Sequence, residues 1–435
     1  MGNERIKAEV LEVAQAAKQA SVGVGLASRQ QRDAALSAMA AALRAHVDEI
    51  VAANGRDMEA ARAAGTKESL LDRLMLDSAR VEAMAAALED LTALPDPLGT
   101  VQEERTLYNG IRLERISVPL GVVAVVYEAR PNVTADAAGI CLKAGNACVL
   151  RGGSMAAASN AAIARVLHDA AVGAGMPKGC IGSIASTDRA ATDELMQLHG
   201  VVDVLIPRGG AGLIRHCVEC SKVPVIETGT GNCHVYVHAT ADFAKARAIV
   251  ENAKCRRYGV CNAAETLLVD RSIAEEFLPG MLSALASHGV ALHCDEAAFA
   301  VAERLAQDGA DVVFDRADES DWETEYLAPE IAVKCVADAD EAIAHVNRYG
   351  THHSEAIVAD GGQAAGAAAI EAFLARVDAA AVYANASTAF TDGGQFGMGA
   401  EIGISTQKLH ARGPFALEAL TSYKYVLRGD GQVRA

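Results

Sequence analysis

The chain has 435 residues, 51% of them apolar, and a formal net charge of −17. A chain of this length is too long for one simple core, so we expect two or more domains. The acidic balance argues against general binding of nucleic acid, because phosphate backbones require clustered lysine and arginine.

Ten cysteines occur without a regular spacing, which fits a reducing cytosol better than a disulfide scaffold. No run of eighteen or more apolar residues and no apolar signal segment is present, so we expect a cytoplasmic protein with no membrane partner. Cys217 and Cys220 form a C-x-x-C, but no second pair follows at zinc spacing and their context predicts one face of a helix. We therefore expect no metal site.

The first part of the chain changes from helical to extended patterns. Residues 5 to about 95 carry helical periodicity, and strands follow from 102 to 127. Asn109-Gly110 lies between two alternating segments, which is the strongest short hairpin signal. The charged residues of these strands predict an edge or an arm. A late strand at 420–427 needs a partner, either this hairpin or a neighbouring subunit.

The middle of the chain predicts two α/β units. The apolar run Gly121–Tyr127 is typical of a strand covered on both faces, and strands and helices alternate after it as far as residue 220. This series predicts a parallel sheet with helices on both faces, which binds ligands at the carboxyl ends of its strands. A second unit begins near residue 224. Strand 355–358, helix 362–374 and strand 378–383 could return to the first sheet.

One stretch, from Asn252 to Thr266, contains two cysteines six positions apart, Cys255 and Cys261. Glycine two residues before Cys261 permits a tight turn, and the nearby Arg256 and Arg257 favour thiolate over thiol. The alternative is that both cysteines are small buried hydrophobic residues.

Two glycine turns follow strands, although the usual G-x-G-x-x-G fingerprint is absent. Each places backbone N–H groups and a helix N-terminus where an anion could lie, and each carries an arginine. The alternative is that the glycines only permit the turn between strand and helix. The residues of interest are Arg151, Gly152 and Ser154 in the first turn, and Arg208, Gly209 and Gly210 in the second.

Two further polar residues end strands. Asn132 is either a helix N-cap or an amide donor to a developing oxyanion. Glu227 is either a proton carrier beside glycines or an ordinary loop residue.

These pieces together resemble the aldehyde dehydrogenase superfamily, whose members also lack that fingerprint. The order of parts agrees: a strand-end Asn, a basic glycine turn, a Glu-x-Gly segment and a cysteine. Within the superfamily the chain is most similar to the γ-glutamyl phosphate reductase family. The similarity extends over nearly the whole chain and is carried by 127–134, 142–146, 223–234, 260–263, 324–327, 349–354 and 385–414. Cys255 and Tyr258 depart from it, where threonine and proline are expected.

The resemblance implies an enzyme that reduces L-glutamyl 5-phosphate with NADPH to L-glutamate 5-semialdehyde and phosphate, in L-proline biosynthesis. Cys261 would be the nucleophile and Asn132 an oxyanion donor. Glu227 would either take part in transfer of the thiol proton or stay turned away from the site. The first glycine turn would bind NADP(H), with Arg151 and Ser154 on its 2′-phosphate, and the second would face the pyrophosphate. Arg130, Arg256 and Arg257 are candidates for the substrate anions.

The resemblance also implies the fold class and organisation: an α/β, aldehyde-dehydrogenase-like chain with two parallel-sheet domains and a β-strand oligomerisation arm. We assign 1–103 and 117–225, with 361–410 returning, to an NADP-binding domain, and 226–360 to a catalytic domain. The arm is assigned to 104–116 and 411–435, which favours a homodimer or tetramer. Association with a glutamate 5-kinase is a further possible partnership.

Two rival functions remain at this stage. One is a hydrolytic NAD(P)-dependent aldehyde dehydrogenase that uses water, and it differs from the reductase in needing no phosphate. The other is a scaffold or partner-binding protein with the same fold, which would show no turnover of NADPH.

Overall fold

The computed structural model of the chain describes residues 2–128 and 130–434. The chain forms two compact units. Unit 1 takes in the residues up to 228, together with 397–403 and those from 415 on, and unit 2 takes in 229–396 and 404–414. None of the described helices is long and apolar enough to cross a membrane.

Unit 1 is built on a parallel sheet with the strand order β5-β4-β3-β6. All six residues of β3 are buried, which confirms the expected strand covered on both faces. The alternation predicted from the sequence is also confirmed by the elements β3 (Val122–Tyr127), α6 (Asn132–Lys143), β4 (Ala147–Gly152), α7 (Ala157–Gly173), β5 (Ile181–Ser183), α8 (Arg189–Met196), β6 (Val204–Arg208) and α9 (Ala211–Cys220).

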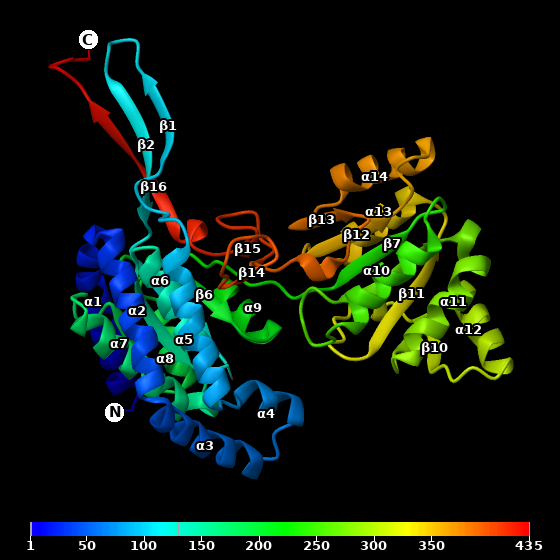
Figure 1. Cartoon of the computed structure of the whole chain (residues 1–435), viewed down its shortest axis with the longest axis horizontal. Helices are drawn as coiled ribbons and strands as arrows, with labels where there is room; N and C mark the ends of the chain where they lie inside the picture. Colours follow the sequence, from blue (N-terminus) through cyan, green and yellow to red (C-terminus); the bar gives the residue numbers. More distant parts are fainter. Residues whose placement is uncertain (1, 129, 435) are drawn as a thin grey trace. The chain divides into compact units, whose positions relative to one another are not determined.

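The N-terminal helices pack closely against this α/β layer (Figure 1). Ser28 and Gln31 form a reciprocal capping box at the start of α2, which satisfies two orphan backbone donors. Gly139 of α6 has no room for a side chain, because a Cβ there would lie 2.3 Å from Leu88 Cδ2. The helices are α1 (Gly2–Leu26), α2 (Arg29–Ala45), α3 (Val47–Ala63), α4 (Glu68–Leu74) and α5 (Ser78–Ala93).

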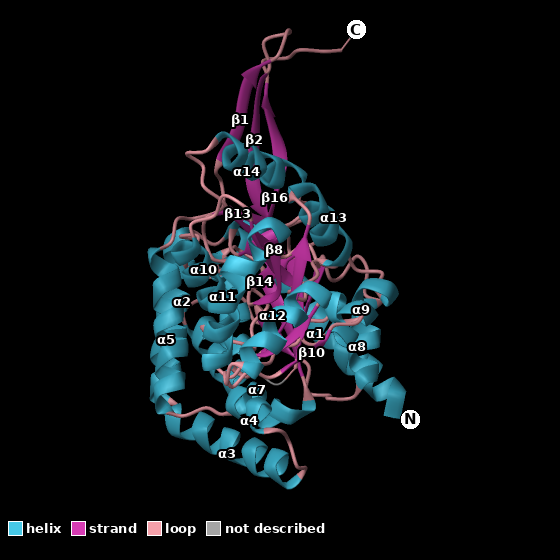
Figure 2. Cartoon of the chain, turned by 90° about the vertical axis from the view of Figure 1, so that its right-hand side faces the viewer, coloured by secondary structure: helices cyan, strands magenta, loops and turns pink. Residues whose placement is uncertain are grey.

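An antiparallel three-stranded arm extends from unit 1, where β1, β2 and β16 lie side by side (Figures 1 and 2). The strands are β1 (Val101–Thr106), β2 (Arg112–Pro119) and β16 (Thr421–Arg428). The expected hairpin around Asn109-Gly110 is present, and β16 pairs with β2 along its whole length. The late strand therefore finds its partner within the same chain.

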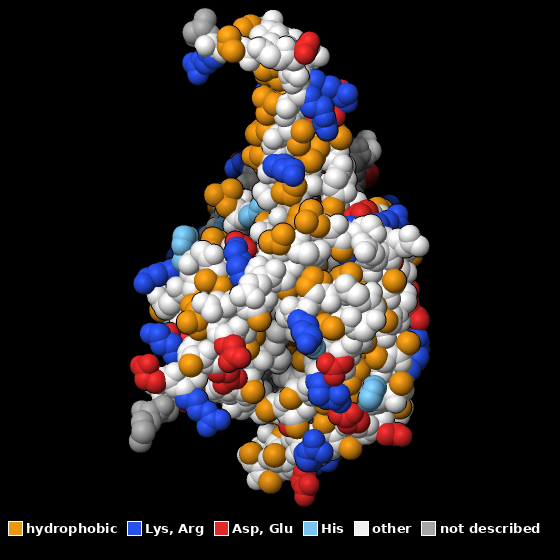
Figure 3. Space-filling model, turned by 90° about the vertical axis from the view of Figure 1, so that its left-hand side faces the viewer, with side chains coloured by type: hydrophobic (Ala, Val, Ile, Leu, Met, Phe, Trp, Pro, Cys, Tyr) orange, Lys and Arg blue, Asp and Glu red, His pale blue; other side chains and the backbone are white. Residues whose placement is uncertain are grey.

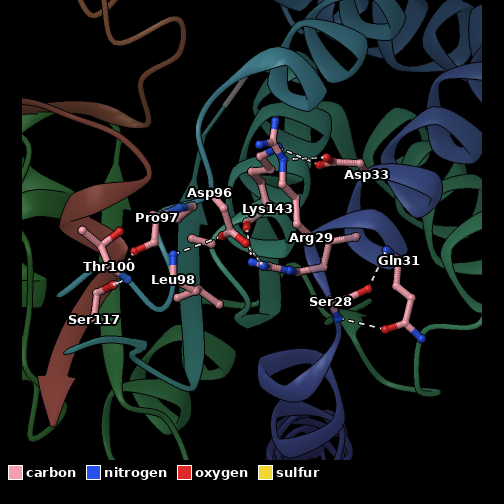
Figure 4. Close-up of polar contacts among 12 residues, drawn as sticks. Ser28, Arg29, Gln31, Asp33, Asp96, Pro97, Leu98, Thr100, Ser117 and Lys143 are labelled. Carbon is pink, nitrogen blue, oxygen red and sulfur yellow. Dashed lines mark hydrogen bonds and ion pairs between the residues drawn. The ribbon is translucent and has the colours of Figure 1, made fainter. Parts of the chain in front are cut away.

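The base of the arm is held by a polar network (Figure 4). Ser117 Oγ donates to the Pro97 carbonyl at 2.6 Å and accepts from the Thr100 N–H at 3.0 Å. Nearby, the buried Lys143 forms an ion pair with Asp33 at 2.6 Å. Since Lys143 ends α6 and Asp33 belongs to α2, this pair fixes the helical layer beneath the arm.

Unit 2 contains a parallel sheet of order β10-β9-β11-β8-β7-β12-β13. Its strands are β7 (Cys233–Val237), β8 (Ala264–Asp270), β9 (Ala291–Cys294), β10 (Phe314–Arg316), β11 (Glu330–Val336), β12 (Ser354–Val358) and β13 (Ala381–Ala384). Its helices are α10 (Phe243–Cys255), α11 (Ala274–Ser287), α12 (Glu296–Gln307), α13 (Ala339–Tyr349) and α14 (Ala364–Arg376). The two short strands β14 (Gly403–Ser405) and β15 (Gly413–Phe415) pair with each other.

The expected return of residues 361–410 to the first sheet is wrong for the strand within that range. Ser354 to Ile357 of β12 pair in parallel with Ala381 to Ala384 of β13, so β13 is the end strand of the unit 2 sheet. The physical reason is local: α14 is a short crossover that returns the chain beside the strand it has just left.

Candidate active site

Cys261 lies on the loop between α10 and β8 and is partly exposed. The ends of this loop are joined by a buried ion pair, in which Lys254 Nζ donates to Glu265 Oε2 at 2.5 Å. Both side chains are fully buried. Within the loop, the Ala263 N–H donates to the Val260 carbonyl at 3.1 Å and forms a tight turn around Cys261.

In this pair, the effect of burial on the two pKa values exceeds the effect of mutual attraction. Burial lowers the pKa of Lys254 and raises the pKa of Glu265 to about 7, while the attraction between the two groups acts against both shifts. Glu265 Oε1 also accepts from the Leu327 N–H at 3.3 Å. The Glu265 carboxylate therefore links the loop that carries Cys261 (residues 256–263) to the turn before β11.

A glycine segment packs directly on the backbone of Cys261. A Cβ at Gly231 would lie 1.5 Å from the Cys261 carbonyl oxygen, so no side chain fits there without moving the backbone of Cys261. The Gly231 N–H donates to Glu325 Oε1 at 2.7 Å. Cys233, the first residue of β7, donates from its Sγ to the Cys261 carbonyl at 3.2 Å. The carbonyl of Cys261 is therefore fixed against the segment 231–233.

Asn262, the residue after Cys261, connects this loop to a distant segment of unit 2. Its Nδ2 donates to the carbonyls of Ala389, at 3.3 Å, and Thr391, at 3.0 Å. The Thr388 hydroxyl donates back to the Asn262 carbonyl at 2.7 Å. The residue after Cys261 is therefore fixed to the segment that begins at Thr388.

The neighbouring Cys255 lies in a different environment. It ends α10, is half-buried and packs against the core of unit 2. Burial raises the pKa of its thiol, which disfavours the reactive thiolate. Arg256 and Arg257, which follow it, are both exposed.

In unit 1, the sequence-predicted residues gather at the carboxyl ends of the parallel strands. Tyr127, the last residue of β3, pairs with Gly152 of β4 and Arg208 of β6, so the three strands end together. Residues 223–226 run parallel beside β6, which places the half-buried Glu227 at the same edge. Arg130 is exposed in the loop after β3.

Asn132 is the first residue of α6 and does not cap it. The cap position belongs to Pro131, and the exposed amide of Asn132 donates from Nδ2 to Asp136 Oδ2 at 3.0 Å. Burial raises the pKa of Asp136 to about 6. Of the two readings from the sequence, the helix cap is wrong and the amide donor remains a prediction.

Both glycine turns are closely packed by neighbouring side chains. A Cβ at Gly152 would lie 2.0 Å from Asn160 Nδ2, and one at Gly209 would lie 2.7 Å from Glu128 Cδ. The Gly210 N–H, at the start of α9, donates to Glu128 Oε2 at 3.1 Å. An anionic oxygen thus already binds this helix N-terminus, where a dinucleotide phosphate could replace it. The second turn therefore fits a phosphate-bearing cofactor.

The first turn offers fewer donors than its sequence suggested. Arg151 is buried, and its Nη2 donates to the carbonyls of Thr187, at 2.8 Å, and Asp188, at 2.9 Å. One nitrogen of the guanidinium is therefore engaged in holding the turn before α8. Ser154 is exposed and begins a short 3-10 turn before α7.

Comparison with known proteins agrees with this architecture. A sequence model of the aldehyde dehydrogenase family matches residues 3–301, so the chain belongs to that family, whose members use a nicotinamide cofactor. Within it, the chain belongs with the γ-glutamyl phosphate reductases. The relative from Moorella thermoacetica is 52% identical over 98% of this chain and 99% of its own length. The relative from Clostridium beijerinckii is 50% identical over 98% and 100%.

A solved structure leads to the same family. The γ-glutamyl phosphate reductase of Thermotoga maritima superposes with a TM-score of 0.92 at 43% identity, covering 98% of this chain and 100% of that one. The resemblance inferred from the motifs and the fold class are both confirmed.

Several contacts of the loop that carries Cys261 were not expected from the sequence. The signal for the ion pair was Glu265, a charged residue at the start of an apolar strand in the same stretch as Lys254 and Cys261. The contacts of Gly231 and Asn262 depend on tertiary folding and left no local signal.

The Lys254–Glu265 pair predicts a specific pattern of stability. Lys254→Met and Glu265→Gln should each lower the free energy of unfolding by about 3–5 kcal/mol, because each leaves a buried group without its partner. Lys254→Met/Glu265→Leu should recover most of that loss. Urea unfolding of the full chain measures all three variants.

The matched control is Arg247→Gln, which breaks an exposed ion pair with Glu251 on the same helix. It should change the free energy of unfolding by about 0.5 kcal/mol or less. Single variants as stable as the parent, or a double variant worse than both, would contradict the role of the pair.

Proposed function

We propose that this chain reduces L-glutamyl 5-phosphate with NADPH to L-glutamate 5-semialdehyde and phosphate, a step of L-proline biosynthesis. The family of the chain gives the reaction class. The observation that carries the assignment of the nucleophile is the fixed backbone of Cys261, clamped by Gly231 and Cys233. A partly exposed thiol on a rigid loop suits covalent catalysis.

The proposed chemistry begins with the Cys261 thiolate. It attacks the acyl carbon, a C–S bond forms, and the C–O bond to phosphate breaks, which leaves a thioacyl group on the enzyme. The bound nicotinamide cofactor supplies the hydride that reduces this thioester. The reduced carbon then leaves as the aldehyde when the C–S bond breaks, and the thiolate is regenerated.

Two further residues have roles in this proposal. The Asn132 amide and the Cys261 N–H are assigned to the oxyanion, where one such donor contributes about 3 kcal/mol. Glu227 is assigned to transfer of the proton of the Cys261 thiol. Activation of water by Glu227, as in a hydrolytic aldehyde dehydrogenase, would waste the acyl phosphate.

The nucleophile and the leaving group are tested together in the reverse direction. Cys261→Ala should abolish oxidation of glutamate semialdehyde, and the parent should show that activity only with phosphate or arsenate. Formation of NADPH at 340 nm is the measurement. Cys255→Ser is the control and should keep activity, since that thiol packs against the core.

Two results would contradict the proposal. Activity retained in Cys261→Ala would remove the nucleophile. Oxidation of glutamate semialdehyde by the parent at full rate without phosphate would favour a hydrolytic aldehyde dehydrogenase.

We propose NADP(H) as the cofactor, with Arg151, Gly152 and Ser154 at the adenosine end and Arg208, Gly209 and Gly210 at the pyrophosphate. The support is chemical: the first turn carries an arginine and, three positions later, a serine with an exposed side chain, and both residue types can bind a 2′-phosphate. In addition, the Gly210 N–H already binds an anionic oxygen.

Arg151→Ala should raise the KM for NADPH about tenfold or more and the KM for NADH much less, because only NADPH carries the 2′-phosphate. Steady-state kinetics with both cofactors measure the ratio. Equal increases would assign Arg151 only to the turn at Thr187 and Asp188 that its Nη2 holds.

Three arginines remain proposed for the substrate anions. Arg130 is exposed after β3, and Arg256 and Arg257 are exposed on the nucleophile loop. We also place the reaction in the cytoplasm, in keeping with ten cysteines of irregular spacing. Association with a glutamate 5-kinase would limit the loss of the unstable acyl phosphate.

The arm is proposed to join subunits in a homodimer or tetramer. Tyr423, Tyr425 and Leu427 alternate along β16 on one face, and each is about half exposed. Figure 3 shows hydrophobic side chains along the projecting arm. A row of exposed apolar residues on an edge strand is a surface that favours association.

The variant Tyr423→Asp/Tyr425→Asp should therefore lower the molar mass in light scattering to that of one chain, 45.1 kDa. Lys424→Ser, on the opposite face of the same strand, should leave the assembly intact. A monomeric parent, or dissociation only in the control, would show that the arm has another role.

A further inference from the structure

A small pocket lies in unit 2 beside the nucleophile loop. Its volume is about 260 Å³, and it is lined by Asn252, Arg256, Ala389, Phe390, Asp392 and Gln395. This is below the ~300–1,000 Å³ of pockets that hold drug-sized ligands, so it suits one end of a small molecule.

Two segments that line the pocket are connected to Cys261, one through the chain itself and the other through a hydrogen bond to Asn262. Arg256 belongs to the nucleophile loop, five positions before Cys261. The opposite wall begins at Ala389, whose carbonyl accepts from the side chain of Asn262, the residue after the nucleophile. The position of the pocket is thus fixed relative to the reactive sulfur by hydrogen bonds within unit 2.

The two charges of the lining are opposite and come from different segments. Asp392 Oδ1 accepts from the N–H groups of Gly394, at 2.9 Å, and Gln395, at 3.1 Å. These bonds orient the carboxylate. Arg256 approaches from the end of α10, and the amides of Asn252 and Gln395 complete a polar lining beside the ring of Phe390.

Such a lining matches a zwitterion better than a phosphate. A dianionic phosphate in this small pocket would meet the Asp392 carboxylate, and like charges repel. A carbon that carries both an ammonium and a carboxylate satisfies both charges at once, because each group forms a charge-assisted hydrogen bond.

We propose that this pocket binds the α-amino-acid end of the substrate, with Arg256 on the α-carboxylate and Asp392 on the α-ammonium. The inference rests on the proposed function, whose substrate carries these groups at the end remote from the reacting carbonyl. It distinguishes Arg256 from Arg130 and Arg257, and it assigns Asp392 to substrate specificity.

The test compares three aldehydes in the phosphate-dependent oxidation. They are glutamate semialdehyde, 5-oxopentanoate, which lacks the amino group, and 4-aminobutanal, which lacks the carboxylate. Arg256→Gln should lower kcat/KM for glutamate semialdehyde and 5-oxopentanoate about tenfold or more and leave 4-aminobutanal nearly unchanged. Asp392→Asn should lower the values for glutamate semialdehyde and 4-aminobutanal and spare 5-oxopentanoate.

Each ratio between two aldehydes comes from one preparation, so a variant that is only partly folded does not distort it. Asn at 392 can still accept from Gly394 and Gln395 through its Oδ1, which keeps the turn. Arg247→Gln, an exposed arginine of α10 outside the pocket, is the matched control and should not change any ratio.

Equal losses on all three aldehydes, or no loss, would overturn the pocket's role while leaving the proposed reaction intact. A parent that oxidises none of the aldehydes in a phosphate-dependent way would instead overturn the proposed function. The two failures are therefore distinguishable.

Discussion

The fully buried ion pair between Lys254 and Glu265 is the constraint on which the loop that carries Cys261 depends. It joins the last turn of α10 to the start of β8, and everything between them, Cys261 included, must close over that short span. Two desolvated charges tolerate little separation, because each would otherwise remain uncompensated in the core. The loop is therefore anchored by electrostatics at its ends and by backbone contacts at its centre, where Gly231 meets the Cys261 carbonyl.

Unit 1 follows a different logic, in which regular secondary structure places the polar residues. β3, β4 and β6 are parallel and end in register, so whatever follows each strand arrives at one edge. This is why Asn132, Arg151 and Arg208 lie at the same edge although 76 positions separate the first from the last. Because the parallel sheet itself brings these residues to one edge, a buried ion pair is not needed to position them.

Local sequence patterns predicted most of this fold. The apolar run of β3 and the Asn109-Gly110 turn were recognised because each depends on neighbours within a few positions. The short strands β9 and β10 were missed, since three or four residues give little periodicity. The sheet predicted for β13 was wrong, because a pattern of apolar residues identifies a strand but not the strand with which it pairs.

The site was predicted in the same uneven way. Cys261 was proposed through its motif and its partners along the chain, whereas Asp392 was not, because the pocket it lines forms only when segments some 140 positions apart pack together. Asn132 showed the limit of residue preferences: an Asn at a helix start is usually a cap, yet Pro131 occupies that position. Arg151 was expected to point to a ligand, and part of its guanidinium instead holds a turn.

The arm has a consequence for the synthesis of the protein. Arg428 on β16 contacts Glu114 on β2 across 314 positions of the chain, among the most non-local contacts of the molecule. During translation β2 emerges long before β16, so the edge of β2 that β16 covers stays open until residues 421–428 have been made. A chain that stops before residue 421 leaves that edge uncovered, although the whole of Cys261's loop is already made. The arm is therefore completed later than the loop that carries Cys261.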